Sequence, residues 1–178
     1  MKIKKFSNNS GISILEVVVA IMIITMGMVG VLSLVIQNVE AQYINKNILM
    51  ASGLAQEGLE LVRNIRDLNW LTSGVDPAND WKRNIVGDGT YTMDYRGLAS
   101  INMAINSMDE AGARLYVDGN GLYTHIVTAK PTNFYRLITV TVVNQGSYDY
   151  LDVKCAIRWK DGTQNHNYVA ETYLYNWR

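Results

Sequence analysis

Residues 12–36 read ISILEVVVAIMIITMGMVGVLSLVI, an apolar run of 25 residues with one charged side chain, Glu16. As an α-helix, a run of this length extends for roughly 37 Å. The hydrocarbon core of a bilayer is about 30 Å thick, so the run is long enough to cross it. The apolar region of a secretory signal peptide is shorter, at about 7–15 residues. The sequence therefore predicts a transmembrane helix over residues 12–36.

The residues before this run predict its orientation. Residues 1–11 carry Lys2, Lys4 and Lys5 and no acidic side chain. Lysine and arginine next to a membrane span are retained on the cytoplasmic side. We therefore expect a single-pass protein of the cytoplasmic (inner) membrane with its N-terminus inside.

The helical pattern continues beyond the apolar run. No proline occurs over residues 37–68, and apolar side chains recur there at steps of three and four. This spacing predicts an amphipathic helix with one buried face, continuous with the first half, so that one helix covers residues 12–68. The stripe consists of Ile44, Ile48, Ala51, Ala55, Leu59, Val62 and Ile65. Gly53 and Gly58 each cost about 1 kcal/mol of helix propensity, so we expect close backbone packing at both.

The period changes after Trp70, and residues 69–178 are predicted to form a β-rich globular head. Short β-like runs alternate with Gly, Asp and Asn turns. The runs are 90–95, 114–117, 122–128, 134–144, 150–160 and 167–177. The last three are long and closely connected, which predicts an antiparallel meander. Residues 98–112 are left as a short helix or a loop. The expected fold class is α+β, with the 37–68 half of the helix packed on the sheet.

Composition and charge limit the possible functions. Hydrophobic residues make up 48% of the chain, which is enough for a core. The formal net charge is zero, and beyond residue 36 the chain holds 15 acids and 13 bases, a net charge of −2. This balance does not favour a nucleic-acid partner. A lone cysteine, Cys155, excludes a Cys-based zinc site and an internal disulfide, and its alternation with Val153 and Ile157 predicts a small core residue.

No motif in the chain predicts catalysis, a metal or a cofactor. His125 is expected to be a packed histidine, and His166 a turn residue in the stretch 164–167. Residues 118–121, Asp-Gly-Asn-Gly, could offer oxygen ligands to calcium. They lack the closing acid of an EF-hand loop, so a hairpin turn is the better interpretation.

Glu16 is the informative side chain of the apolar run. A carboxylate at the centre of a membrane span costs a few kcal/mol, so a compensating charge is expected. A cut between Gly11 and Ile12 would place a new α-ammonium one helical turn from Glu16, where an i,i+4 pair can form. The ammonium of a neighbouring copy could serve equally well. Such a pair discriminates strongly between axial registers, because a mismatch leaves one charge bare in low dielectric.

The stretch GISILEVVVA, residues 11–20, resembles the class III leader junction of type IV pilins and type II secretion pseudopilins. In that family a prepilin peptidase removes the basic leader after the glycine and N-methylates the new first residue. The resemblance implies a leader over residues 1–11, cleavage between Gly11 and Ile12, methylation of Ile12 and a registry role for Glu16 in assembly. The family usually has Phe at the methylated position, where this chain has Ile12.

Residues 51–67, ASGLAQEGLELVRNIRD, are similar to minor pilins of the PilV type and related minor pseudopilins. Many pilins close a C-terminal disulfide loop, which Cys155 alone cannot do. The resemblance implies a pilin-like fold, with a prepilin peptidase and methyltransferase, other pilin or pseudopilin subunits and inner-membrane lipid as partners. It also implies a final location in a pilus at the cell surface or in the periplasm.

Three functions remain open at this stage. The first is a structural subunit, a minor pilin or pseudopilin of a type IV pilus or related filament. The second is a tip adhesin or DNA-uptake subunit on the same scaffold, and the third, a remote alternative, is a signal-anchored enzyme. The sequence does not distinguish a pilus from a secretion pseudopilus, or a major from a minor subunit.

Overall fold

The computed structural model describes residues 11–72, 81–85, 88–96, 103–104, 107–108, 111–127, 129–145 and 148–176. The predicted leader therefore lies outside the described residues, apart from Gly11. The chain divides into two units, Met1–Lys46 and Asn47–Arg178.

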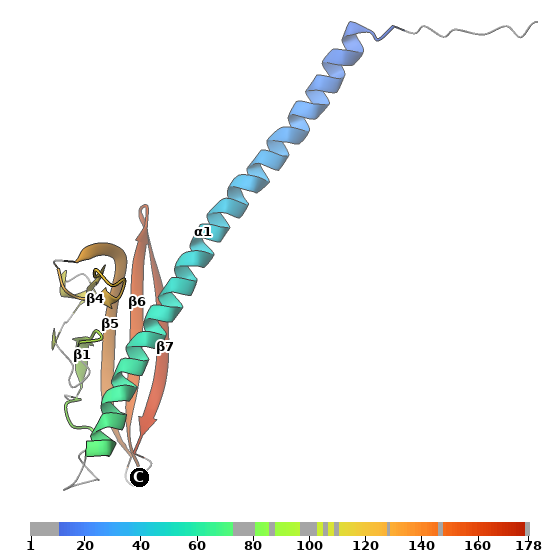
Figure 1. The fold of residues 1–178 in the computed structure, drawn as a ribbon. Helices are drawn as coiled ribbons and strands as arrows, with labels where there is room; N and C mark the ends of the chain where they lie inside the picture. Colours follow the sequence, from blue (N-terminus) through green and yellow to red (C-terminus); the bar gives the residue numbers. More distant parts are fainter. Residues whose placement is uncertain are drawn as a thin grey trace, which may run out of the picture. The chain divides into compact units, whose positions relative to one another are not determined.

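One helix, α1, covers Ile14–Thr72 and contributes to both units (Figure 1). The prediction of a single helix over residues 12–68 is thus confirmed, with a start two residues later and an end four residues later. Ser13 stands just before the helix, and its carbonyl oxygen accepts hydrogen bonds from the backbone N–H groups of Glu16 at 3.0 Å and Val17 at 3.2 Å. Serine is a favoured residue at this position.

The second unit contains seven strands within the described residues, all paired antiparallel. They are β1 (Gly89–Thr92), β2 (Met103–Ala104), β3 (Arg114–Val117), β4 (Tyr123–Thr124), β5 (Lys130–Gln145), β6 (Tyr148–Asp161) and β7 (Gln164–Tyr175), with a 3-10 turn, η1, over Ala111–Ala113. The α+β class is confirmed. Strand β2 is new, because residues 98–112 gave no β pattern.

Strands β5, β6 and β7 form the predicted meander (Figure 1). Strand β6 pairs with β5 from Phe134↔Trp159 to Gln145↔Tyr148, and with β7 from Tyr150↔Tyr175 to Asp161↔Gln164. The other edge of β5 is shared by two short strands. Strand β1 pairs at Gly89↔Val140, and β3 pairs at Val117↔Lys130. The length of β5, 16 residues, is what allows one edge to hold two partners.

Residues 47–72 of α1 pack on one face of the sheet. The buried residues of this segment are Asn47, Ala51, Leu54, Ala55, Gly58, Leu59, Leu61, Val62, Ile65, Asn69 and Trp70. They share a core with alternate residues of β6, from Leu151 to Trp159, which are all buried. Five of the seven residues of the predicted stripe are in this core. Ile44 and Ile48 are not: Ile44 is only partly buried, and Ile48 is 39% exposed.

The two glycines of this segment differ in their surroundings. A Cβ added at Gly58 would lie 2.6 Å from the sulfur of Cys155 and 3.3 Å from Cδ of Arg136. The close packing predicted at Gly58 is therefore confirmed. At Gly53 nothing lies within 4 Å of an added Cβ, so the same prediction there is wrong.

This difference predicts opposite effects for the same substitution. Gly58→Ala is expected to lower the free energy of unfolding by about 1–2 kcal/mol, because overpacking outweighs the gain in helix propensity. Gly53→Ala is expected to raise it by about 0.5–1 kcal/mol. Urea unfolding of the detergent-solubilised chain measures both. The double variant Gly58→Ala, Cys155→Ala should recover part of the loss, and equal effects at the two glycines would contradict the packing described here.

The turns of the head are largely as expected. Asp118 N donates to Leu122 O at 3.0 Å, and Gly121 adopts a positive φ of 83°, so residues 118–121 form the predicted turn. Gly162, at φ 55°, lies in the turn that links β6 and β7. His166 is not in a turn, as had been expected. It lies within β7, and its ring stacks on that of Trp159 with centroids 5.2 Å apart.

Candidate functional site

The first candidate site is the start of α1, where sequence analysis placed the cleavage and methylation residues. Gly11 and Ile12 both precede the helix and are exposed, Ile12 to 76%. An added Cβ at Gly11 would meet no atom within 4 Å. The peptide bond between them thus lies outside the helix. Cleavage and methylation there remain predictions.

Glu16 occupies the third position of the helix. Ser13 and Glu16 have the spacing of a capping box, in which a Ser at the N-cap is followed three residues later by Glu or Gln. A negative charge in the first turn is also stabilised by the positive end of the helix dipole. Glu16 therefore has a local reason to stand in the first turn, in addition to the pairing with a terminal ammonium that the sequence predicts. That pairing requires the cleaved chain and remains a prediction.

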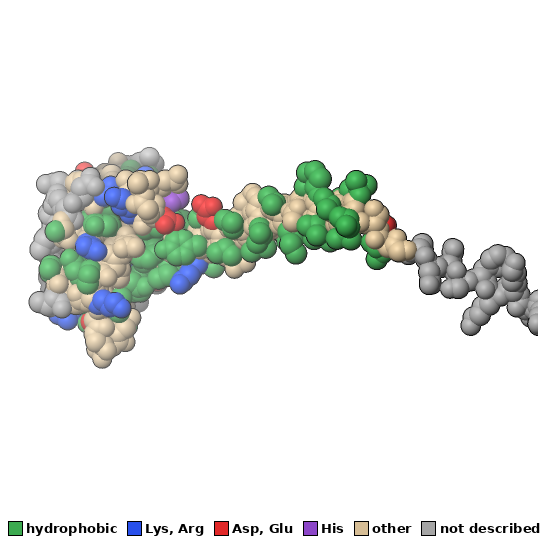
Figure 2. Space-filling view, turned by 90° about the horizontal axis from the view of Figure 1, so that it is seen from above, with side chains coloured by type: hydrophobic (Ala, Val, Ile, Leu, Met, Phe, Trp, Pro, Cys, Tyr) green, Lys and Arg blue, Asp and Glu red, His purple; other side chains and the backbone are tan. Residues whose placement is uncertain are grey.

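The surface that follows Glu16 is almost entirely apolar. Figure 2 shows hydrophobic side chains along the exposed part of the helix. No residue of the most apolar part of α1 is buried. Side chains such as Ile24, Leu32 and Ile36 are each more than half exposed. By length and composition, this part of α1 could cross a membrane. Burying such a surface in lipid or protein would be strongly favourable.

The second candidate site is the buried guanidinium of Arg136 on β5, whose side chain is fully buried. Its Nη2 donates to Met93 O at 2.7 Å, and its Nη1 donates to Leu54 O at 3.3 Å and lies 3.1 Å from Glu57 Oε1. Arg136 thus connects the helix, the sheet and the segment after β1. Sequence analysis missed this role. The available signal was the alternation of β5, which places Arg136 in phase with the apolar residues Ile138 and Val140.

A buried carboxylate, that of Asp94, follows Met93, whose carbonyl oxygen Arg136 binds. Its oxygens accept hydrogen bonds from the Thr124 hydroxyl at 2.6 Å and from the backbone N–H groups of Arg96 and His125. Burial alone would raise the pKa of Asp94, but these hydrogen bonds outweigh it, and the pKa lies below its usual value. The carboxylate therefore fixes the end of β4 and the residue that follows it.

His125 is a packed histidine, as expected. Burial, with a smaller contribution from the charge of Arg136, lowers its pKa from 6.5 to about 4. Burial also raises the pKa of the Cys155 thiol to about 12. Cys155 is fully buried, as predicted, and a protonated thiol is a poor nucleophile. No group of three or more His, Cys, Asp or Glu side chains that could hold a metal ion occurs in the described part of the chain.

The low pKa of His125 predicts a pH dependence of stability. The unfolded chain binds a proton at this residue near pH 6.5, whereas the folded chain does so only near pH 4. Stability from this residue is therefore present above pH 6.5 and is lost as the pH falls toward 4, by about 2–3 kcal/mol. Unfolding curves at pH 7 and pH 4.5 should show this loss. The variant His125→Leu should show a smaller difference between the two curves, and an unchanged difference would contradict the assignment.

Comparison of the chain with protein-family models, with curated proteins and with solved structures found no match.

Proposed function

We propose that this chain is a structural subunit, a minor pilin or pseudopilin, of a type IV pilus or a related filament. A prepilin peptidase would remove residues 1–11, Ile12 would become the methylated first residue, and the subunit would wait in the inner membrane before assembly. The observation that carries the proposal is the junction GISILEVVVA heading an apolar segment of α1, residues 14–36, whose side chains are all exposed.

The physical mechanism follows from the exposed surface of residues 12–36. In the membrane this surface contacts lipid. In a filament it would contact the same segment of neighbouring copies. The apolar surface would thus be kept away from water both in the membrane and in the filament. Dispersion and packing between the helices would then favour the filament. Apolar helices can pack at many axial offsets with similar energy. The pairing of Glu16 with the terminal ammonium of a neighbouring subunit would favour one of these offsets.

The architecture of the second unit supports a role outside the membrane. Residues 47–72 of α1 pack through one buried face on an antiparallel sheet, as expected for a folded head. The opposite face of β6 carries Asp152, Lys154 and Lys160, which suits an aqueous compartment. The head would set the surface or tip properties of the filament.

Co-expression with a prepilin peptidase and the remaining subunits of a filament system tests this function. We expect the tagged chain in the membrane fraction and, after shearing of the cells, in the filament fraction. A deletion of residues 12–36 is the control, and it should appear in neither fraction. Recovery of the parent chain only as a soluble protein would contradict the proposal.

A further inference from the structure

Gly53 on α1 has no packing partner among the described residues. Glycine is one of the residues least favourable to a helix, so a glycine inside a helix commonly has a packing reason. Gly58 has such a reason, because the sulfur of Cys155 lies where a Cβ would be placed, whereas a Cβ added at Gly53 would meet no atom within 4 Å. The missing side chain at Gly53 therefore leaves a space beside α1 that the described residues do not fill.

This space is part of an apolar groove, which we call the Gly53 groove. It has a volume of about 210 Å³ and is lined by Leu49, Met50, Gly53, Leu54 and Glu57 of α1 and by Tyr123 of β4. The one charged group in this lining, the carboxylate of Glu57, lies 3.1 Å from Nη1 of Arg136. The groove therefore suits an apolar side chain better than a charged one.

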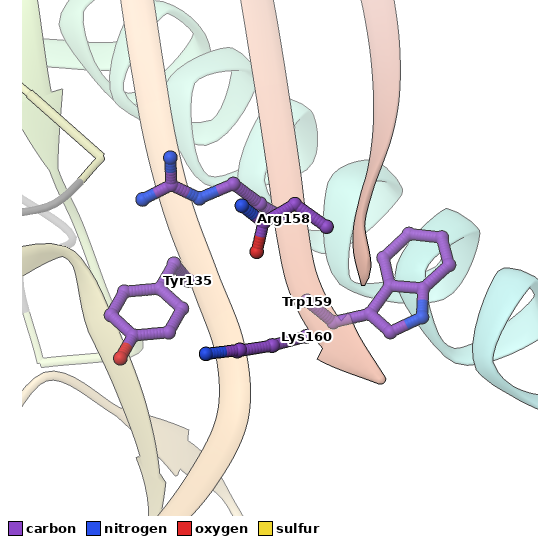
Figure 3. Close-up of a pocket in the computed structure, with 5 residues that line it drawn as sticks. Tyr135, Arg158, Trp159 and Lys160 are labelled. Carbon is purple, nitrogen blue, oxygen red and sulfur yellow. The ribbon is translucent and has the colours of Figure 1, made fainter. Parts of the chain in front are cut away.

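A pocket on the sheet has the opposite character. Figure 3 shows Tyr135, Arg158 and Lys160 extending to one side of the strands, and Asn165 also lines this pocket. Charged and amide groups of this kind are readily accommodated in water. The Gly53 groove differs, because an apolar lining is stabilised when it is covered.

Leu49 is an exposed apolar side chain next to this groove. It is 72% exposed and lies on the same side of α1 as Gly53, because residues four apart stand one above the other on a helix. In packed helices, a large side chain of one helix inserts into a space between side chains of the other. Two parallel copies of α1 that are offset by four residues would place Leu49 of one copy level with Gly53 of the next.

The proposed filament requires a similar offset for a separate reason. Pairing of Glu16 with the terminal ammonium of Ile12 in a neighbouring copy shifts the two helices by about four residues, which is roughly 6 Å. Helix α1 is continuous from Ile14 to Thr72, so parallel copies keep the same shift in residue number along its length. Two features that lie far apart in the sequence thus agree on one axial offset.

The charges of the two helices are compatible with this offset. With a shift of four residues, Glu60 of one copy is level with Gln56 of the other, and Glu57 is level with Gly53. A shift of three residues would instead place Glu60 level with Glu57, where like charges repel. The distribution of charge therefore favours four residues over three.

We propose that Leu49 of one copy inserts into the Gly53 groove of the next copy in the filament. This inference rests on the proposed function and deepens it, because it names a contact outside the apolar run of residues 12–36. The contact selects the same axial offset as Glu16. The partner of the groove is thus a second copy of this chain.

Oxidative cross-linking in filaments tests this contact. Cells would produce two differently tagged full-length chains, Leu49→Cys and Gly53→Cys, together with a prepilin peptidase and the remaining subunits of a filament system. After oxidation with copper phenanthroline, we expect a disulfide-linked dimer that carries both tags, because facing Cβ atoms would come within bonding reach. Either variant alone should give at least about tenfold less dimer, because its cysteines are one helical turn apart in neighbouring copies. Cys155 is fully buried and contributes little background.

Filling or emptying the contact provides a second measurement. Gly53→Leu occupies the groove and is expected to reduce the sheared filament fraction by at least about tenfold, with cleavage after Gly11 unchanged. Leu49→Ser should also reduce it. Leu71→Ser is the matched control, because Leu71 is 76% exposed on the same helix, and it should assemble as the parent does. Thermal unfolding of each variant establishes that the head is folded.

The outcomes separate this contact from the proposed function. If the parent chain enters filaments but the mixed cysteine variants give no dimer, the contact is overturned and the proposed function stands. The same holds if Gly53→Leu assembles as well as the parent, or if Leu71→Ser is as defective as Leu49→Ser. If the parent chain enters no filament fraction, the proposed function fails, and the contact fails with it.

Discussion

Replacing Glu16 with glutamine or with valine is expected to leave cleavage after Gly11 intact and to reduce the filament fraction by at least about tenfold. In the proposed assembly the carboxylate faces a terminal ammonium in an apolar surround. Removing it leaves that ammonium bare, which costs several kcal/mol per subunit before relaxation. The rest of the segment is apolar and packs similarly at every axial offset between subunits. No other side chain in it can therefore replace Glu16 in fixing that offset. Shearing and quantitative immunoblotting measure the fraction.

The two substitutions separate the charge of Glu16 from its place in the first turn of α1. Glutamine can replace glutamate in a capping box with Ser13, whereas valine cannot. If glutamine supports normal assembly and valine does not, Glu16 acts only at the helix start. Glu40→Gln is the matched control, because Glu40 is an exposed acid on the same helix beyond the apolar run. It should assemble as the parent does.

Arg136→Met is expected to lower the free energy of unfolding of the head by about 2–4 kcal/mol. The substitution removes the donor to Met93 O, which is 2.7 Å away, and the second donor to Leu54 O on α1. A buried carbonyl left without its donor costs about 1–3 kcal/mol, and the shorter side chain adds a packing loss. Urea unfolding, followed by tryptophan fluorescence, gives the change.

Glu57→Gln provides the comparison for Arg136→Met. The side chain of Glu57 is 38% exposed, so its ion pair with Arg136 is screened by water. We expect a loss of at most about 1 kcal/mol from this variant. A loss as large as that of Arg136→Met would show that the ion pair, rather than the carbonyl contacts, makes Arg136 important.

The sequence predicted those elements whose pattern is local. A 3.6-residue period gave the helix, and the alternating β-branched runs gave β5, β6 and β7 to within a few residues, because each strand pairs with its neighbour in the chain. The burial of Cys155 and the close approach at Gly58 followed from the same patterns. Gly53 and Ile48 were misassigned: both are exposed although Ala51 and Leu54 are buried, so they lie outside the helix face that packs on the sheet.

The remaining features depend on contacts between residues far apart in the chain. The pairing of both β1 and β3 with one edge of β5 leaves no mark on the sequence of any single strand. Arg136 contacts residues 82 and 43 positions away. The sequence showed that Arg136 alternates in phase with the buried residues of its strand. It did not show which distant residues would contact the guanidinium.

The central claim is that Ile12 becomes the first residue of the functional chain. Intact-mass and N-terminal peptide analysis of the protein, purified from cells that contain a prepilin peptidase, tests it most directly. We expect a chain that has lost residues 1–11, begins at Ile12 and carries one added methyl group on its terminal nitrogen. A mature chain that keeps the leader, or begins at any other residue, would contradict it.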